Sequence, residues 1–184
     1  MTFLIVLGLV VVVVGYVVMA YNKFVSQKNN VEEAWSDIEV QMKRRYNLIP
    51  NLVESVKGYA GHEKDTFEMV VKARTAAVGN TGSPSEQAKT ENILSGALKS
   101  LFAVAEAYPD LKASKNFMDL QGQLTEVEDH IQKARRFYNG NVRDLNTRIE
   151  QFPSNIIANW FGFIKAEFFE LDDPEAAKVP EVKF

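Results

Sequence analysis

The residues best suited to metal or acid–base chemistry are two histidines, His62 and His130, among 24 acidic residues. A di-iron helical bundle takes ligands from Glu-x-x-His pairs, in which a glutamate precedes each histidine by three positions. Here those positions hold Tyr59 and Val127. Glu126 lies four residues before His130, on the same face of the predicted helix. We therefore predict no metal site and no cofactor, and we interpret Glu126, Glu128 and Asp129 as a solvated helix face.

Other catalytic patterns are also missing from the chain. It contains no cysteine, no phosphate-binding glycine loop and no G-x-S-x-G sequence. A net charge of -3 provides no excess of basic residues for the nucleic-acid backbone. We predict a protein without enzymatic activity, nucleic-acid partner or identified small-molecule substrate, with an unrecognised carboxylate hydrolase as a third alternative.

A charged residue interrupts an apolar heptad stripe in the sequence "KRRYNLIPNLV". Arg45 is the charged member of this stripe, and a buried guanidinium needs a carboxylate or carbonyl partner. Glu106, in "EAYPDL", is the partner that we predict, and the alternative is that Arg45 extends along the seam to reach water. The stripe alternates steps of three and four residues: Val31, Trp35, Ile38, Met42, Arg45, Ile49, Leu52, Val56 and Tyr59.

Three residues with marked backbone preferences accompany this pair. Pro50 lies inside the same helix and predicts a kink. Tyr108 and Pro109 mark a sharp end of a later helix. We predict that Arg45, Pro50, Glu106, Tyr108 and Pro109 fasten the far tip of a helical bundle.

The elements that would position these residues begin with an apolar run, residues 3–20, that holds no charge. It would span about 27 Å as a helix, close to the hydrocarbon thickness of a bilayer. We predict a transmembrane anchor over residues 1–22, and a cleaved signal peptide is the alternative. Gly8 and Gly15 share one face and would let neighbouring spans approach closely. Lys23 and Lys28 follow the run, which places the N-terminus outside and the body in the cytoplasm.

The remaining pattern is helical throughout. Residues 21–60, 63–78, 85–108 and 114–152 predict four helices that form a long up-down bundle over residues 23–152. The first and fourth helices would measure about 60 and 57 Å, so they could pair along their lengths. The fourth helix carries three residues of low helix propensity that packing or hydrogen bonds must hold: Asn139, Asn141 and Asn146.

An aromatic segment, residues 153–171, follows the bundle at the expected height of Tyr21 and predicts an amphipathic helix. Its apolar face could lie at the membrane interface, contact a neighbouring subunit or fold back on its own bundle. Residues 172–184 form an acidic, proline-containing tail. The predicted contact residues are Tyr21, Ile156, Ile157, Trp160, Phe161, Ile164 and Phe168.

Several stretches together resemble the LemA family of bacterial membrane proteins. They are "YNKFV", "VEEAWSDIEVQMKRRYNLIPNLVESVKGYAGHE", "AEAYPDLKASKNFMDLQGQLTEVEDHIQKARRFYN" and "VRDLNTRIEQFPSNIIANWFGF". The resemblance implies a single N-terminal span with a cytoplasmic helical bundle. It supplies no reaction or cofactor. Relatives include a magnetosome protein associated with membrane invagination, and family members have been linked to envelope maintenance.

The predicted protein is all-α, with a transmembrane helix that continues into an antiparallel four-helix bundle. We expect a single-pass protein of the bacterial inner membrane that self-assembles as a scaffold or membrane-shaping element. Its partners would be the lipid bilayer and further copies of itself. The alternative is an adaptor that docks another envelope protein for maintenance, quality control or signalling.

Overall fold

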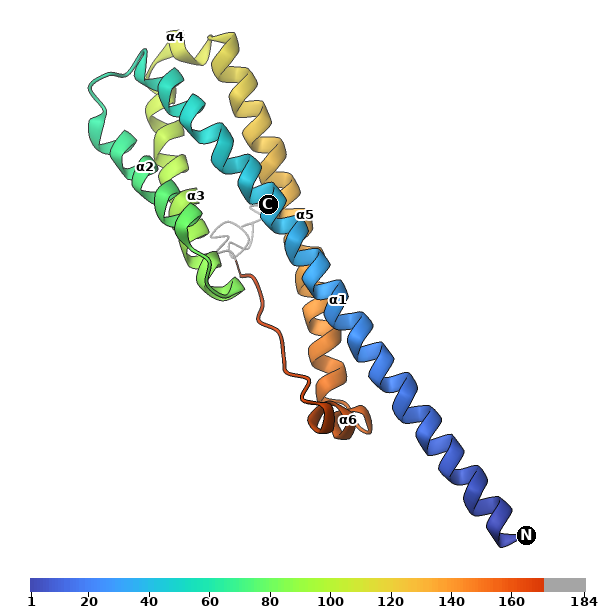
Figure 1. Ribbon diagram of the computed structural model, residues 1–184. Helices are drawn as coiled ribbons and strands as arrows, with labels where there is room; N and C mark the ends of the chain where they lie inside the picture. Colours follow the sequence, from blue (N-terminus) through green and yellow to red (C-terminus); the bar gives the residue numbers. More distant parts are fainter. Residues whose placement is uncertain (171–184) are drawn as a thin grey trace, which may run out of the picture. The chain divides into compact units, whose positions relative to one another are not determined.

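The computed structural model describes residues 1–170, and no strand occurs within that range. The all-α class predicted from the sequence is therefore confirmed. Figure 1 shows the helices in chain order. They are α1 (Thr2–Lys57), α2 (Lys64–Gly79), α3 (Pro84–Glu106), α4 (Pro109–Lys112), α5 (Lys115–Glu150) and α6 (Ser154–Phe161).

The chain divides into two compact units, and both long helices contribute to each. Unit 1 comprises residues 1–40 and 131–168, which hold the first part of α1, the last part of α5, and α6. Unit 2 comprises residues 41–130, together with residues 169 and 170 of the described range. That residues 23–152 form one bundle stays a prediction, as does the anchor over residues 1–22, and the predicted tail lies outside the described residues.

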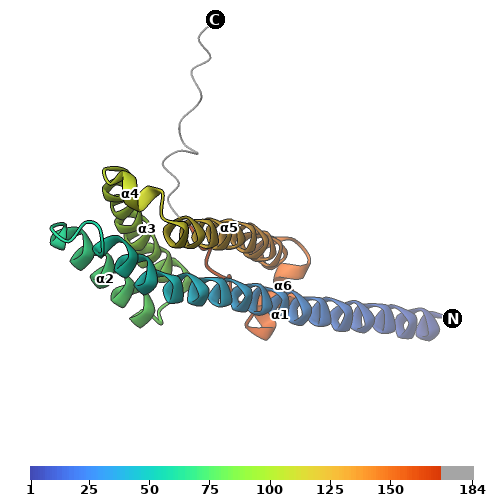
Figure 2. The ribbon, with the colours of Figure 1, turned by 90° about the horizontal axis from the view of Figure 1, so that it is seen from above.

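Unit 2 contains a four-helix arrangement built from α1, α2, α3 and α5. The short connection between α2 and α3 makes them antiparallel neighbours, and they run side by side in Figures 1 and 2. The Ser83 backbone N–H donates to the Glu86 carboxylate at 3.0 Å and Pro84 opens α3, which is a strong helix start. Apolar side chains from all four helices form the core, which includes Leu52, Val56, Val70, Leu94, Leu98, Leu101 and Leu124.

The predicted third helix ends earlier than the sequence pattern indicated. It was expected to reach Tyr108 and to stop at Pro109, but α3 ends at Glu106. Pro109 is instead the first residue of α4, where its missing N–H costs nothing. Tyr108 is the extended residue between the two helices, as the restriction on a residue before proline requires.

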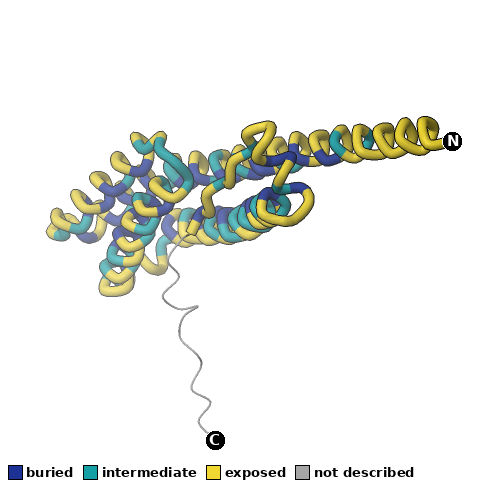
Figure 3. The backbone as a smooth tube through the Cα atoms, turned by 90° about the horizontal axis from the view of Figure 1, so that it is seen from below, coloured by how far each residue is buried: buried dark blue, intermediate teal, exposed yellow. Residues whose placement is uncertain are grey.

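Unit 1 pairs the first part of α1 with the last part of α5, and α6 packs beside them. Its buried side chains come from all three helices: Phe24, Ala34, Ile38, Ile131, Tyr138, Val142, Leu145, Ile157 and Ala158. The apolar run at the start of α1 packs against almost nothing in the chain, as the exposed colour along its length in Figure 3 shows. Among the described helices, α1 is the one whose length and composition suit a membrane span, with a mean hydropathy of 3.0 over 18 residues.

The predicted aromatic helix over residues 153–171 is wrong in its extent. α6 ends at Phe161, because Gly162 adopts a left-handed conformation with φ of 73° and donates its N–H to the Ala158 carbonyl. Glycine reaches that conformation without a steric cost and so ends helices in this way. Residues 163–170 then run without helical structure, and Leu171 lies outside the described residues.

Candidate functional site

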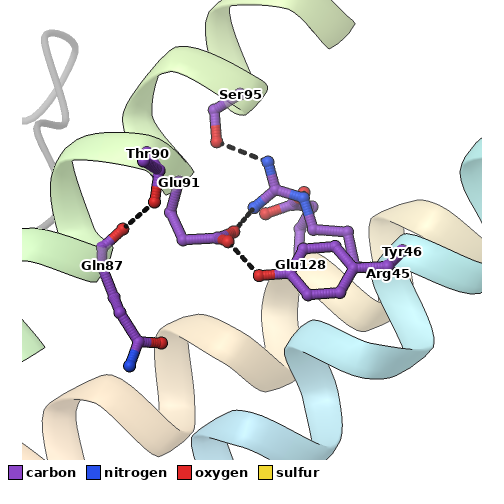
Figure 4. Close-up of polar contacts among 7 residues, drawn as sticks. All are labelled: Arg45, Tyr46, Gln87, Thr90, Glu91, Ser95 and Glu128. Atoms are coloured by element: carbon purple, nitrogen blue, oxygen red, sulfur yellow. Dashed lines mark hydrogen bonds and ion pairs between the residues drawn. The ribbon is translucent and has the colours of Figure 1, made fainter. Parts of the chain in front are cut away.

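A buried polar cluster in unit 2 surrounds Arg45, whose side chain is fully inaccessible to solvent. Its Nη1 donates to Glu91 Oε2 at 3.3 Å and its Nη2 donates to Ser95 Oγ at 2.7 Å. Its Nε lies 3.0 Å from Glu128 Oε1, which makes an ion pair by distance. Tyr46 completes the cluster by donating its hydroxyl to Glu91. Figure 4 shows how α1, α3 and α5 each supply a charged side chain.

The predicted pair of Arg45 with Glu106 is therefore wrong. Arg45 lies twelve residues before the end of α1, and Glu91 lies fifteen residues before the end of α3. These separations correspond to about 18 and 22 Å, so Arg45 is level with Glu91 and far from the tip. Glu106 is exposed at the end of α3. The alternative that Arg45 reaches water at the seam is wrong as well.

Glu91, which sequence reasoning missed, carries a signal in the apolar spacing of α3. It stands on the same three-four pattern as Leu94, Leu98, Leu101 and Ala105, all of which are buried. A lone carboxylate on one apolar stripe and a lone guanidinium on another predict a buried pair. The interpretation of Glu128 as part of a solvated face is wrong, because its carboxylate pairs with the buried Arg45 and its side chain is only 35% exposed.

Burial dominates the electrostatics of the two carboxyl groups. It raises the pKa of Glu91 above its ordinary value of 4.5, against the opposite effects of Arg45 and of the Tyr46 hydrogen bond. Burial also raises the pKa of Glu128, against the attraction of Arg45. One guanidinium faces two carboxylates, so the cluster holds one surplus negative charge when both are ionised. It can fasten α1, α3 and α5 together, and it favours uptake of a proton as the pH falls.

We expect the stability of the protein to depend on pH through these groups. A folded pKa above the unfolded value means that the folded state binds more protons between the two values. The free energy of unfolding should therefore rise as the pH falls from neutral towards 4.5, the ordinary carboxyl value. Glu91→Gln should flatten this slope in denaturant unfolding of the full-length protein in detergent. Glu126→Gln, which removes an exposed carboxylate on α5, is the control, and equal slopes in the two variants would refute the assignment.

Pro50 has a specific structural consequence in α1. In an α-helix its N–H would bond to the carbonyl of Tyr46, four residues earlier, but proline has no N–H. Arg74 of α2 supplies the missing donor, because its Nε donates to the Tyr46 carbonyl at 2.8 Å. The proline therefore frees an acceptor through which α2 is attached to α1. This bond lies next to the Arg45 cluster, rather than at the predicted far tip.

We expect the contribution of Arg74 to depend on Pro50. Arg74→Met should lower the free energy of unfolding by about 1–3 kcal/mol, because it leaves the Tyr46 carbonyl without a donor. In a Pro50→Ala background the backbone N–H of the introduced alanine replaces the lost donor, so Arg74→Met should cost less. A double-mutant cycle from denaturant unfolding measures this coupling. Additive effects of the two substitutions would contradict the interpretation.

An aromatic cluster in unit 1 joins α6 to the end of the apolar run. The ring of Tyr21 lies 4.9 Å from that of Phe161 and 5.7 Å from that of Phe163, measured between centroids. Phe163 also stacks on the buried Phe24 at 4.7 Å. The turn at Gly162 makes this possible, because it directs Phe163 back towards α1. The ring contact thus places the end of α6 beside Tyr21, the residue that follows the apolar run, and Figure 2 shows α6 next to α1.

The predicted contact residues of this segment do not share one face. Ile157 is buried within unit 1, which agrees with the alternative of a segment folded back on its own helices. Ile156 and Trp160 lie away from the buried side of α6, Ile164 and Phe168 lie beyond its end, and Phe161 is half exposed although its ring contacts Tyr21. Their exposed fractions are 57% for Ile156, 76% for Trp160, 49% for Phe161, 83% for Ile164 and 38% for Phe168.

The segment after α6 is held to α5 by polar side chains. Asn146 donates to the Ala166 carbonyl and accepts from the Ala166 N–H, both at 2.9 Å. The Tyr138 hydroxyl donates to the Glu167 carbonyl at 2.8 Å, and burial with the nearby Glu167 charge raises the pKa of Tyr138 to about 12. The Asn141 side chain donates to the Phe137 carbonyl of its own helix at 3.0 Å. Asn141 and Asn146 therefore both make side-chain hydrogen bonds, and those of Asn146 reach a distant segment.

The residues first considered for chemistry lie on open surface. His130 Nε2 is 3.6 Å from Glu126 Oε1, and both side chains line an exposed groove of about 340 Å³ with Arg44, Asn47 and Gln123. His62 is exposed in the turn between α1 and α2. Within residues 1–170, no three histidine, aspartate or glutamate side chains are grouped to hold a metal ion. Gly8 and Gly15 have no neighbouring atom at the position of a missing Cβ, so their face of α1 is open.

The fold and these sites define an all-α protein with one N-terminal apolar helix. The model of the LemA family matches residues 34–184, and the chain belongs to that family. It is 29% identical over 186 residues to the magnetosome proteins MamQ 1 and MamQ 2 of Paramagnetospirillum magneticum, which covers 88% of this chain and 68% of each relative. It is 27% identical over 161 residues to protein LemA of Metamycoplasma hominis, which covers 86% of this chain and 72% of the relative.

These relationships bear on function only coarsely. Neither magnetosome protein MamQ nor protein LemA is named as an enzyme. Membership of the family, together with the apolar start of α1, indicates a membrane-associated protein.

Proposed function

We propose that this protein is a non-enzymatic, membrane-anchored helical element that self-associates at the bacterial inner membrane, as a scaffold or to shape the bilayer. The observation that carries the proposal is the exposure of the apolar run. Its large side chains from Phe3 to Val14 are each at least 49% exposed, so the folded chain leaves them without partners. Lipid or further copies of the chain must cover such a surface in a stable protein.

The N-terminus lies outside and the helical units lie in the cytoplasm in this proposal. Two positive charges that closely follow the run support this orientation: Lys23 and Lys28. Self-association uses the face that contains Gly8 and Gly15. Their lack of side chains permits close helix approach, and none of residues 1–170 lies within 4 Å of the Cβ positions on that face.

Oligomeric state in lipid tests the proposal. Full-length protein in nanodiscs should give discrete oligomers by native mass spectrometry and by imaging, and a monomer in both measurements would refute self-association. Gly8→Ile with Gly15→Ile should weaken the oligomer. Val10→Ile, which adds bulk on the opposite side of the helix, should not.

A second candidate function, an adaptor for another envelope protein, is favoured by a groove on unit 2. The groove has a volume of about 380 Å³ and an apolar floor of Phe67 and Val71. Three basic side chains and one acidic side chain also line it: Lys57, Lys64, Lys72 and Glu68. An acidic segment with an apolar anchor would fit this chemistry.

Crosslinking in cells separates the two candidates. A homotypic ladder supports assembly, whereas a reproducible heterologous band supports the adaptor. That band should disappear with Val71→Glu, which places a charge on the apolar floor. It should persist with Ile93→Glu, a matched change at an exposed apolar residue of α3.

A further inference from the structure

The exposed side of α6 is apolar and distinct from the side that packs. Ser154, Ile157 and Ala158 are buried against unit 1, whereas Ile156 and Trp160 are exposed. Phe152 before the helix and Ile164 after it extend the exposed surface, at 76% and 83% exposure. We call Phe152, Ile156, Trp160 and Ile164 the outer face of α6. Four large apolar side chains that a folded unit leaves exposed on one side indicate a surface that another molecule or a membrane covers.

The outer face carries no charge of its own. No ionisable residue occurs from Phe152 to Ile164. The nearest charged groups along the chain are Glu150 and Lys165, and they form an ion pair with each other. The outer face therefore has no charge with which to attract a charged protein surface or anionic lipid. Its chemistry is that of aromatic and aliphatic groups, with tryptophan at its centre.

The height of α6 relative to the apolar run is set by direct contact within unit 1. Phe161 packs on Tyr21, which is the residue after the run. With the run across the hydrocarbon region, Tyr21 lies at the boundary between acyl chains and headgroups, where tryptophan and tyrosine gather. α6 must then lie at the same boundary, because rings in contact cannot differ much in depth.

We propose that the outer face of α6 inserts into the headgroup boundary of the same bilayer that α1 crosses. Its occupant is a lipid surface rather than a second copy of the chain, because Phe161 fixes α6 against Tyr21, at the end of the run that lipid surrounds. An interfacial helix buries its apolar side by about 5–10 Å. The protein thus contacts the bilayer twice, through α1 and through α6. This inference rests on the proposed function, since it requires that α1 spans the membrane.

The two tryptophans make the proposal measurable in the full-length protein. Trp35→Phe leaves Trp160 as the sole tryptophan, and Trp160→Phe leaves Trp35. The Trp35 ring lies 5.3 Å from the ring of Tyr138, in a tilted arrangement. It is about 22 Å beyond the apolar run along α1, so its emission reports on a position outside the bilayer. Each variant is reconstituted in vesicles of zwitterionic phosphatidylcholine, at high lipid excess. Some vesicles carry bromine near the top of the acyl chains and others near the ends.

We expect bromine near the top of the acyl chains to quench most Trp160 emission, bromine at the chain ends to quench less, and Trp35 to keep its emission in both. Added anionic lipid should change nothing. Trp160 emission that is blue-shifted but unquenched, and that shifts to the red on dilution with lipid, would assign the face to a second copy and overturn the proposal. Unquenched emission without such a shift would place α6 in water and overturn it as well.

Flotation of the same vesicles separates failure of this inference from failure of the proposed anchor. Protein that floats with the vesicles while Trp160 is unquenched retains its anchor, and only the role of α6 is refuted. Protein that neither floats nor shows quenching lacks the anchor, and both proposals are then refuted.

Discussion

Arg45→Met should lower the free energy of unfolding by about 3–5 kcal/mol, the largest single effect that we expect in unit 2. The substitution leaves Glu91, with a side chain 2% exposed, without its cation and close to Glu128. An unpaired buried carboxylate is costly because it loses both hydration and its counter-charge. Denaturant unfolding of the full-length protein in detergent, followed by helical circular dichroism, measures the loss.

A second variant separates this penalty from the net value of the pair. Arg45→Met combined with Glu91→Met should recover most of the stability, since replacing both members of a buried pair by apolar groups is often neutral. Lys43→Met, which removes an exposed cation from the same helix, is the matched control and should have little effect. A structural role for the cluster would be refuted if Arg45→Met and Arg45→Ala both left the free energy of unfolding unchanged.

Phe24→Ala should cost about 3–5 kcal/mol, the largest effect that we expect in unit 1. Phe24 is fully buried and stacks on Phe163, so its removal leaves a cavity under the segment that carries α6. The segment after Gly162 should become more accessible as well. Amide hydrogen exchange at Ala166, whose N–H bonds to Asn146, reports that change.

Phe137→Ala is the matched control for this prediction, because Phe137 is an aromatic residue of unit 1 that is 60% exposed. Its replacement should alter stability by no more than about 0.5 kcal/mol. A similar loss in both variants would show that aromatic surface in general, and not the stack on Phe163, stabilises unit 1. Faster exchange at Ala166 in Phe24→Ala alone is the expected pattern.

Local patterns predicted the helices well and their boundaries less well. The three-four spacing around Arg45 and the turn residues after Gly79 belong to single segments, so the sequence displays them directly. The apolar spacing from Ile156 to Leu171 predicted a helix that continues past Gly162, but the helix ends there. The left-handed conformation of Gly162 shows that the backbone preference prevailed over the apolar pattern.

The sequence identified members of the candidate sites, such as Arg45 and Pro50, but not the residues that they contact. That Arg45 needed a carboxylate followed from its place on an apolar stripe, but the choice of Glu91 instead of Glu106 depended on the lengths of three helices. An error of three helical turns in placing Arg45 relative to the tip was enough to select the wrong glutamate. The link from Pro50 to Arg74 was hidden for the same reason, since it joins two helices.

The sequence by itself determined the apolar run, the all-α class and the family, because each is expressed in composition, periodicity or contiguous motifs. Only the tertiary structure decided which carboxylates surround Arg45, which donor replaces the N–H that Pro50 lacks, and which side of α6 remains open beside Tyr21. The physical reason is that ion pairs, hydrogen bonds and ring contacts between elements depend on relative register. Register follows from the packing of whole helices, and no single segment encodes it.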